Sequence, residues 1–174
     1  MSTFIVARPS NDLRRTNPQI DPRGPQFAAA VTAVVLIAIL AVPSAAVAIA
    51  LTAVQAVLFA IGAAAGVQNT PHAFVFRTLI RPRLAPPSEL EDATPPRFAQ
   101  GVGLAFTAAA LVGFAFGAPT VALVAIGFAL VAALLNAVFR FCLGCELYLG
   151  LVRLSRAVSP ERKVRIAAPR GPAH

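Results

Sequence analysis

The stretch that decides the fold is FAAAVTAVVLIAILAVPSAAVAIALTAVQAVLFAIGAAAG (Phe27–Gly66), which contains no Asp, Glu, Lys, Arg or His. This uncharged run is about twice as long as the roughly 20 residues that a helix needs to cross a bilayer core of about 30 Å. Pro43 lies near its middle, within VPSA, and proline cannot continue the hydrogen-bond ladder of a helix. The stretch therefore predicts a hairpin of two transmembrane helices, at about 27–42 and 45–66.

A second apolar block, Phe98–Phe139, has the same character and also lacks charged residues. Its internal turn is GAPT (Gly117–Thr120), so it predicts spans at about 98–116 and 120–140. The 174 residues are 57% hydrophobic and 13% charged, with a mean hydropathy of +0.74. A soluble chain of this size cannot bury so much apolar surface. The predicted fold class is an all-α membrane protein with four transmembrane helices.

The polar segments complete the predicted domain organisation. Asp21 and Pro25 are typical of a helix start, and the preceding tail, 1–20, is expected to be disordered and basic. Apolar residues at helical spacing in 72–80 predict a short interfacial helix in a Pro-rich loop. The four-span domain is expected to occupy 21–156, followed by a disordered basic tail at 157–174. The first apolar block is too long for a cleaved signal peptide, which predicts that the first span is retained.

The basic residues predict the orientation in the membrane. All 15 Lys and Arg lie in the N-terminal tail, the middle loop or the C-terminal segment, and the turns at Pro43 and Pro119 have none. The positive-inside rule then places both termini and the middle loop in the cytoplasm, with the protein in the inner (plasma) membrane. The net charge of +8 follows from these flanks. They do not form the aromatic-interleaved patch of a nucleic-acid-binding protein, so no nucleic acid is expected as a partner.

The two halves of the chain resemble each other. Four residues recur after 71 positions: Asp21, Pro25, Phe27 and Ala28 match Asp92, Pro96, Phe98 and Ala99. In addition, VQAVLF (Val54–Phe59) resembles LNAVFR (Leu135–Arg140), which places Gln55 opposite Asn136. Both hairpins start from the same side, so the repeats are parallel and related by an axis along the membrane normal. Duplication of a stable hairpin is favoured over a transport-type repeat as the explanation.

Small and amide residues within the spans predict how the helices pack. GAAAG (Gly62–Gly66) and GFAFG (Gly113–Gly117) are small-xxx-small patterns, which favour close helix packing within the bundle over a dedicated dimer face. Gln55 and Asn136 are intramembrane polar residues that need partners in hydrocarbon, so both are expected to point into the bundle. Interhelical hydrogen bonding is favoured over a transport or ligand role. The lack of ionisable residues in the spans counts against a proton-coupled transporter.

The only two cysteines, Cys142 and Cys145, lie together in FRFCLGCELYLG (Phe139–Gly150), between Arg140 and Glu146. Three interpretations are open: a reactive dithiol, small structural residues, or thiolate ligands of a metal. Cytoplasmic thiols stay mostly reduced, which argues against a permanent structural disulfide.

A zinc site is the least favoured of the three interpretations. Zinc takes four ligands, and one chain adds only His72, His174 and Glu146 to the cysteines. Such a site would need a second copy of the chain or another partner, so no metal and no cofactor is expected.

The local backbone decides how reactive the cysteines are. If the fourth span continues through Cys145, both thiols lie near a helix C-terminus, which raises the pKa of a thiol. If the chain breaks near Phe141 and a new helix begins, Cys142 gains backbone N–H groups that lower its pKa. Arg140 would stabilise a thiolate, whereas Glu146 would disfavour it but can carry a proton. The sequence leaves both backbones open.

Three stretches carry a resemblance to a known family: DPRGPQFAAA, FRTLIRPRLAPPSELEDATPPRFAQGVG and LLNAVFRFCLGCELYL. Over about residues 17–153 the chain resembles a bacterial multi-pass membrane family, domain of unknown function 4395. The resemblance implies a membrane protein without an assigned activity, and thioredoxin-like or sulfurtransferase proteins as partners. It carries over no catalytic residue.

Three functions are compatible with these features. The first is a thiol-redox or sulfur-handling component that uses Cys142 and Cys145, tuned by Arg140 and Glu146. The second is a scaffold or accessory subunit of a membrane complex or homo-oligomer, and the third is a transporter of small solutes or sulfur compounds. The sequence does not decide whether the protein is an enzyme.

Overall fold

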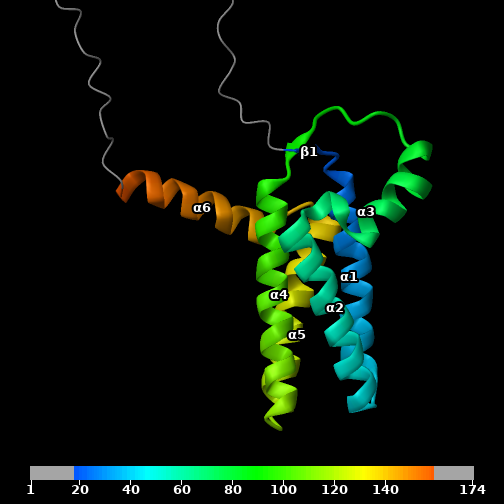
Figure 1. Cartoon of the computed structure of the whole chain (residues 1–174), viewed down its shortest axis with the longest axis vertical. Coiled ribbons are helices and arrows are strands. Elements are labelled where there is room, and N and C mark those ends of the chain that lie inside the picture. Colours follow the sequence, from blue (N-terminus) through cyan, green and yellow to red (C-terminus); the bar gives the residue numbers. More distant parts are fainter. Residues whose placement is uncertain (1–17, 159–174) are drawn as a thin grey trace, which may run out of the picture.

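The computed structural model describes residues 18–158, whose four long helices lie side by side in a bundle (Figure 1). These are α1 (Arg23–Ala41), α2 (Ala45–Ala65), α4 (Thr94–Ala115) and α5 (Pro119–Phe139), each of 19 to 22 residues. At about 1.5 Å per residue, each helix is about 30 Å long, which matches a bilayer core. All four are apolar enough to cross a membrane. The predicted fold class, an all-α protein with four membrane-spanning helices, is confirmed.

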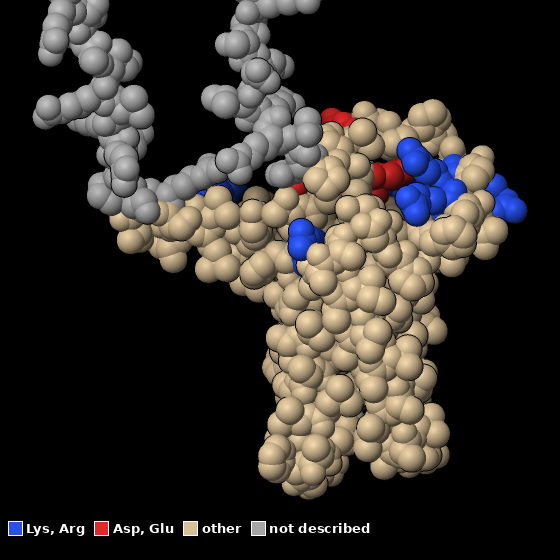
Figure 2. Space-filling view, in the orientation of Figure 1, with Lys and Arg blue, Asp and Glu red and all other residues tan. Residues whose placement is uncertain are grey.

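Charge is distributed unevenly along the bundle. Charged side chains gather at the end that carries the short strands, α3 (Pro71–Val75) and the start of α6 (Leu143–Val158), and the rest of the face in Figure 2 shows none. We call this the charged end, and the opposite end the turn end. The outer helix surface is apolar, with exposed side chains such as Val34, Val57 and Phe128. An uncharged apolar belt of this length identifies a multi-pass membrane protein.

Alanine and glycine let the helices approach closely inside the bundle. Five of the eight buried residues of the core cluster are alanines, packed around Leu36, Ile39 and Ile126. A Cβ added to Gly62 would lie 2.7 Å from Gln100 Oε1, and one added to Gly113 would lie 3.0 Å from the Ala122 nitrogen. These glycines pack helix on helix, as in other membrane bundles.

The second glycine of each small-xxx-small pattern has another role. Gly66 (φ +94°) and Gly117 (φ +68°) adopt positive φ values where α2 and α4 end. Glycine reaches this conformation without steric cost, so these two residues terminate helices.

The beginnings of α1 and α4 are built alike. Asp21 Oδ1 accepts the N–H of Arg23 (3.0 Å), and Asp92 Oδ1 accepts the N–H of Thr94 (2.8 Å). Asp92 and Thr94 each lie 71 positions after their counterparts Asp21 and Arg23. Strands β1 (Gln19–Ile20) and β2 (Glu91–Asp92) pair antiparallel and join the two helix starts. The predicted repeat is therefore present at the level of backbone and capping.

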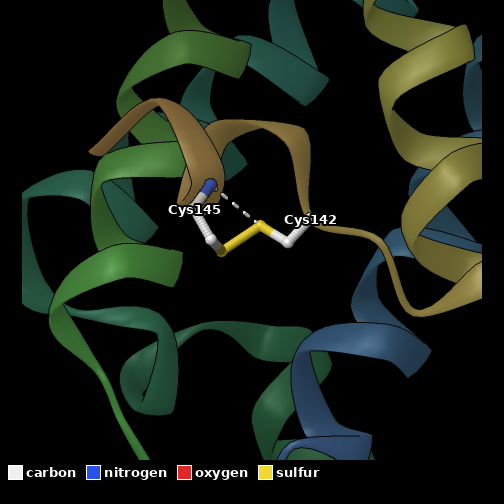
Figure 3. The surroundings of a disulfide bond; sticks show 2 residues. All are labelled: Cys142 and Cys145. Carbon is white, nitrogen blue, oxygen red and sulfur yellow. Dashed lines mark hydrogen bonds between the residues drawn. A yellow bond between two sulfur atoms is a disulfide. The ribbon is translucent and has the colours of Figure 1, made fainter. Parts of the chain in front are cut away.

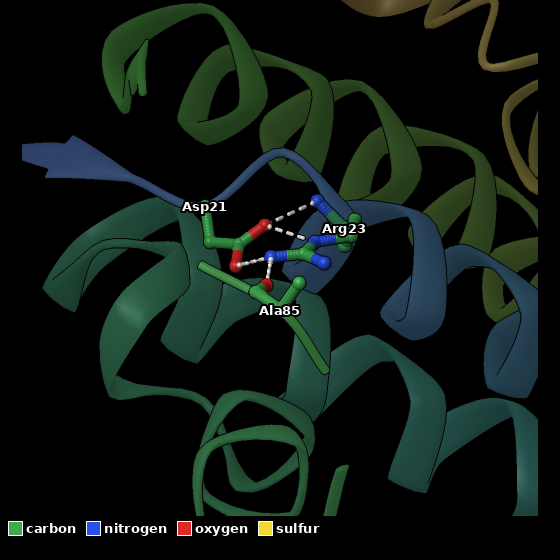
Figure 4. A network of polar contacts seen from close by, with 3 residues as sticks. All are labelled: Asp21, Arg23 and Ala85. Carbon is green, nitrogen blue, oxygen red and sulfur yellow. Dashed lines mark hydrogen bonds and ion pairs between the residues drawn. The ribbon is translucent and has the colours of Figure 1, made fainter. Parts of the chain in front are cut away.

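The Asp21 turn also holds the middle loop. Arg23 pairs with Asp21 at 2.9 Å and donates to the carbonyl of Ala85 at 3.0 Å (Figure 4). The hydrogen bond from Arg23 lowers the pKa of the Asp21 carboxyl. This contact fastens the loop before β2 to the first turn of α1.

The two hairpins pack across each other: α1 lies mainly on α5, and α2 lies mainly on α4. In the first turn of α1, Gln26 Nε2 donates to the carbonyl of Ala137 near the end of α5 (2.9 Å). In the first turn of α4, Arg97 Nε donates to the carbonyl of Ala63 near the end of α2 (2.7 Å), and its Nη2 to that of Ala64 (2.8 Å). The start of one half's first helix thus donates hydrogen bonds to carbonyls at the end of the other half's second helix, where no helical N–H is available.

One detail of the predicted repeat is wrong. Gln55 is the eleventh residue of α2, whereas Asn136 is the eighteenth of α5, so the helix starts align Gln55 with Ala129 and Asn136 with Gly62. The short VQAVLF match suggested another register because alanine and valine recur throughout both spans.

The segment after α2 is helical with changing pitch: η1 (Val67–Asn69), α3, the π turn η2 (Phe76–Ile80) and η3 (Arg81–Arg83). It lies across the charged end (Figure 1), where the sequence predicts an interfacial helix at 72–80. Helix α6 projects sideways from the same end and runs two residues into the predicted tail at 157–174. The tails predicted to be disordered, 1–20 and 157–174, lie mostly outside the described residues.

Candidate redox site at the charged end

The chain breaks between α5 and α6, at Arg140. Arg140 has φ 56°, and no other non-glycine residue of the described part has a positive φ. Its N–H bonds to the carbonyl of Asn136 (3.1 Å), and the N–H of Phe141 reaches back to Leu135 (3.2 Å). This pair of bonds closes a helix end. Of the two backbones that the sequence leaves open, the structure has the one in which a new helix begins after Phe141.

Cys142 is the residue directly before α6. The N–H of Cys145 donates to Cys142 Sγ at 3.2 Å (Figure 3). The N–H of Glu146 donates to the Cys142 carbonyl at 3.0 Å. The two sulfur atoms are bonded in a disulfide at 2.10 Å. Both side chains are half-buried. Cys142 therefore takes the place of an N-cap residue, with its sulfur directed at free backbone N–H groups.

The first repeat has a matching cap without sulfur. Thr70 Oγ1 accepts the N–H of Ala73 at 3.2 Å and so caps α3, with the same three-residue spacing as the cysteine pair. Gly66, with its positive φ, stands at the end of α2 as Arg140 stands at the end of α5. Cys142 and Cys145 are thus the second repeat's counterparts of Thr70 and Ala73.

Gly144 lets the first turn of α6 lie directly on α4. A Cβ at this position would be 2.6 Å from the Ala99 Cβ and 2.7 Å from its Cα. One turn further on, the rings of Tyr148 and Phe98 lie 5.6 Å apart. The glycine inside the Cys-x-x-Cys motif therefore positions the cysteines against the bundle.

The two residues predicted to tune the thiols lie close in sequence but are exposed. Arg140 forms the end of α5, and Glu146 lies in the first turn of α6, where a carboxylate interacts favourably with the helix N-terminus. Their influence on the sulfur atoms stays a prediction. Residues 18–158 contain no group of three or more His, Cys, Asp or Glu side chains that would hold a metal.

A cavity of about 350 Å³ adjoins both cysteines. It lies between α1, α4, α5 and the first turn of α6. Its polar lining includes Asn136 and Arg140 from the second half of the chain, and Gln26 from α1. Asn136 was singled out from the sequence, and the structure places it in the same cavity as Cys142 and Cys145.

Gln100 also lines this cavity and was missed from the sequence. It lies in α4, within a predicted span, so it is a third intramembrane amide besides Gln55 and Asn136. The signal that reveals it is plain: a glutamine in an otherwise apolar block.

Gln55 lies elsewhere, in a second cavity of about 280 Å³. The residue is 1% exposed, its Nε2 donates to Thr32 Oγ1 at 3.5 Å, and its Oε1 has no partner. Gln55 and Asn136 do not bond to each other. Burial lowers the pKa of His72, which lines the same second cavity, so its neutral form is favoured there.

The repeat relates the two cavities. Pro25, Ala28 and Thr32 line the second cavity, and their counterparts Pro96, Ala99 and Gly103 line the first. Likewise Thr70, His72 and Ala73 correspond to Cys142, Gly144 and Cys145. The two cavities adjoin, because Pro25, Thr32 and Gln100 line both of them, and the sulfur atoms belong to the first.

Comparison with known families supports the resemblance seen in the sequence. The family model described as domain of unknown function (DUF4395) matches residues 20–153. The chain belongs to this family. The DUF4395 match includes all four long helices, both capped helix starts and the cysteine pair. No curated protein and no solved structure matches the chain.

Proposed function

We propose that this DUF4395 protein is a thiol–disulfide exchange component of the inner membrane, with its cysteine pair facing the cytoplasm. The observation that carries the proposal is the position of Cys142 at the N-terminus of α6, where its sulfur accepts the N–H of Cys145. In the reduced protein this position favours a thiolate on Cys142, because backbone N–H groups and the helix N-terminus stabilise negative charge. Cys142 is then the attacking thiol and Cys145 the resolving thiol.

The exchange proceeds in two displacements. The Cys142 thiolate attacks one sulfur of a partner's disulfide, a mixed disulfide forms, and the partner's other sulfur leaves as a thiolate that takes up a proton. Cys145 then loses its proton and attacks Cys142 Sγ, which releases the partner's second thiol. Two electrons pass to the partner, and the Cys142–Cys145 disulfide results. Glu146 is a proton carrier for Cys145, and Arg140 offsets its charge.

The distribution of basic residues supports the cytoplasmic side, because the described Lys and Arg lie at the charged end or on α6, and the two turns at the turn end contain none. The family resemblance points to thioredoxin-like or sulfurtransferase proteins as exchange partners. The transporter hypothesis would need a polar path past Gln55 and Asn136. Gln55 is 1% exposed and donates to Thr32 Oγ1, which supports a packing role for this amide instead.

Trapping the mixed disulfide tests the assignment. Cys145→Ser removes the resolving thiol and should accumulate a mixed disulfide through Cys142, visible as a reducible band on a non-reducing gel. Cys142→Ser should trap none, and the double variant is the control for background. Equal trapping by both single variants would contradict the roles given to the two cysteines.

The sidedness is tested separately with a membrane-impermeant maleimide on the reduced protein. Labelling is expected in inside-out vesicles and not in right-side-out vesicles. The reverse pattern would place the charged end outside the cell.

A further inference from the structure

The cavity beside the cysteines has the properties of a site for a membrane-borne electron carrier. We propose that it binds the head group of a lipid-soluble quinone, which exchanges two electrons with the Cys142–Cys145 pair. This inference rests on the proposed thiol exchange and adds the class of the second redox substrate.

The first argument is the depth of the cavity. Its lining extends from Cys142 at the charged end to Phe106 and Phe128, which lie near the middle of α4 and α5. Asn136 and Phe128, both on α5, are eight residues apart, which corresponds to about 12 Å along a helix. The cavity thus enters the part of the bundle that crosses the membrane.

The second argument is the direction in which the cavity opens. Phe128 is 61% exposed and Val131 is 54% exposed, although both line the cavity. These side chains also belong to the apolar belt, so the opening is on the lipid-facing surface. A molecule dissolved in the bilayer can enter there while its tail remains among the lipid chains.

The third argument is the chemistry of the lining. At the inner end the rings of Phe106 and Phe128 are stacked, with centroids 6.1 Å apart, and offer a surface for a flat conjugated ring. Nearer the cysteines, the side-chain amides of Gln100 and Asn136 form no hydrogen bond with another described residue. Amide N–H groups suit the two carbonyl oxygens of a quinone, which are acceptors only.

The reaction balances without a further reagent. The dithiol loses two electrons and two protons, its two S–H bonds break, and the S–S bond forms. The quinone takes up both electrons and both protons, and its two carbonyl oxygens become hydroxyls. A reduced soluble dithiol protein then renews the pair by the reverse of the exchange described above: its thiolate attacks the Cys142–Cys145 disulfide, its own disulfide forms, and Cys142 and Cys145 each end as a thiol. Electrons then pass from a soluble dithiol to the membrane.

The test uses the purified full-length protein, reduced, freed of reductant and kept in detergent without oxygen. The probe is decylubiquinone, whose fully substituted ring prevents direct addition of a thiol. Loss of quinone absorbance is followed together with the free thiol count, and one quinol per disulfide is expected. The double Cys→Ser variant should show no reaction.

Two variants examine the cavity itself. Ala132→Phe fills it from α5, and Asn136→Leu removes an amide. Each should slow quinone reduction about tenfold, which corresponds to about 1.4 kcal/mol, while exchange with glutathione disulfide changes less than about twofold. Ala109→Phe adds the same side chain at an exposed position of α4 outside the cavity, and it should react like the unmodified protein.

The outcomes separate the two proposals. If the protein exchanges with glutathione disulfide but reduces no quinone, the quinone site is wrong and the thiol exchange stands. If it reacts with neither, both are wrong. If Ala109→Phe slows the quinone reaction as much as Ala132→Phe, or if both cavity variants reduce quinone at the normal rate, the cavity is not the site.

Discussion

At the scale of single residues, Asp21 links charge to stability. It accepts hydrogen bonds from the backbone and guanidinium of Arg23, and its pKa is lowered chiefly by the side-chain hydrogen bond. A carboxyl whose pKa is lower in the folded state stabilises the fold above its unfolded pKa of about 3.9. That contribution is lost as the pH falls through the lower, folded pKa.

We therefore expect Asp21→Asn to lower the melting temperature in detergent at pH 7, with a smaller difference from the unmodified protein below about pH 4. The N–H of Arg23 can still bond to the asparagine oxygen, so the loss comes from the ion pair. Glu89→Gln alters an exposed loop carboxylate that forms no ion pair with another described residue, and it serves as control. A pH-independent loss for Asp21→Asn would argue against the ionic explanation.

Arg97 gives a second prediction at this scale. Its guanidinium binds the carbonyls of Ala63 and Ala64, and Arg97→Met would leave both without this donor. Both hydrogen bonds are exposed, and such a bond contributes about 0.5–1.5 kcal/mol net, so the melting temperature should fall by a few degrees. Arg97→Gln restores the residue that the first repeat uses, Gln26, and should recover part of the stability. Equal effects of Met and Gln would show that the hydrogen bonds do not matter.

The candidate site shows which residues a sequence can reveal. Cys142, Cys145 and Asn136 stand out because sulfur and amide groups are rare in an apolar chain, and Gln100 was visible for the same reason. Their common cavity was not predictable, since it depends on which helices cross. The left-handed Arg140 was not predictable either, because non-glycine residues seldom adopt positive φ.

At the scale of elements, the four long helices followed from length and hydropathy, because a bilayer sets both. The start of α6 was one of two alternatives that the sequence left open, because it depends on whether the chain turns at Arg140 or continues as α5. Its leucines nevertheless lie three or four residues apart, and Leu147, Leu151 and Leu154 are exposed. An apolar face on a helix that projects sideways from the charged end fits the membrane interface (Figure 1).

Gly144 is the residue that decides how α6 docks. We expect Gly144→Ala to push the first turn of α6 away from Ala99, which lowers stability and speeds reduction of the disulfide by dithiothreitol. Gly150→Ala lies in the same helix with no atom within 4 Å of the added Cβ, and it should be neutral or slightly stabilising.

Gly144→Ala combined with Ala99→Gly removes the clash, so the double variant should regain the original reduction rate. If Gly144→Ala and Gly150→Ala behave alike, close packing of α6 on α4 is not what positions the cysteines.

At the scale of the whole molecule, the repeat joins two hairpins that depend on each other. Its 71-residue spacing was visible at the helix starts, where Asp and Pro have fixed roles. The packing of each helix on a helix of the other half, α1 on α5 and α2 on α4, could not be predicted from the sequence. Hydrophobic patterning does not specify which apolar faces meet.

This arrangement predicts the behaviour of a divided chain. A break between Pro87 and Ser88, in the exposed loop before β2, should give fragments 1–87 and 88–174 that co-purify from membranes when expressed together. Fragment 1–87 alone should be degraded or aggregate, because α1 and α2 lack their main partners α5 and α4; in fragment 88–174, α4 and α5 keep their mutual packing, but the faces that cover α2 and α1 are left bare. A stable, monodisperse fragment 1–87 would show that the first hairpin is a folding unit. Arg97→Met in the second fragment should weaken the association.

The crossed packing also sets the order in which the protein is completed during synthesis. Helix α1 is synthesised first, and its principal neighbour α5 begins 96 residues after it (Arg23 to Pro119), so α1 is made well before its partner. Cys142 and Cys145 emerge after every long helix that surrounds their cavity. The two cysteines are therefore synthesised only after the long helices that line their cavity.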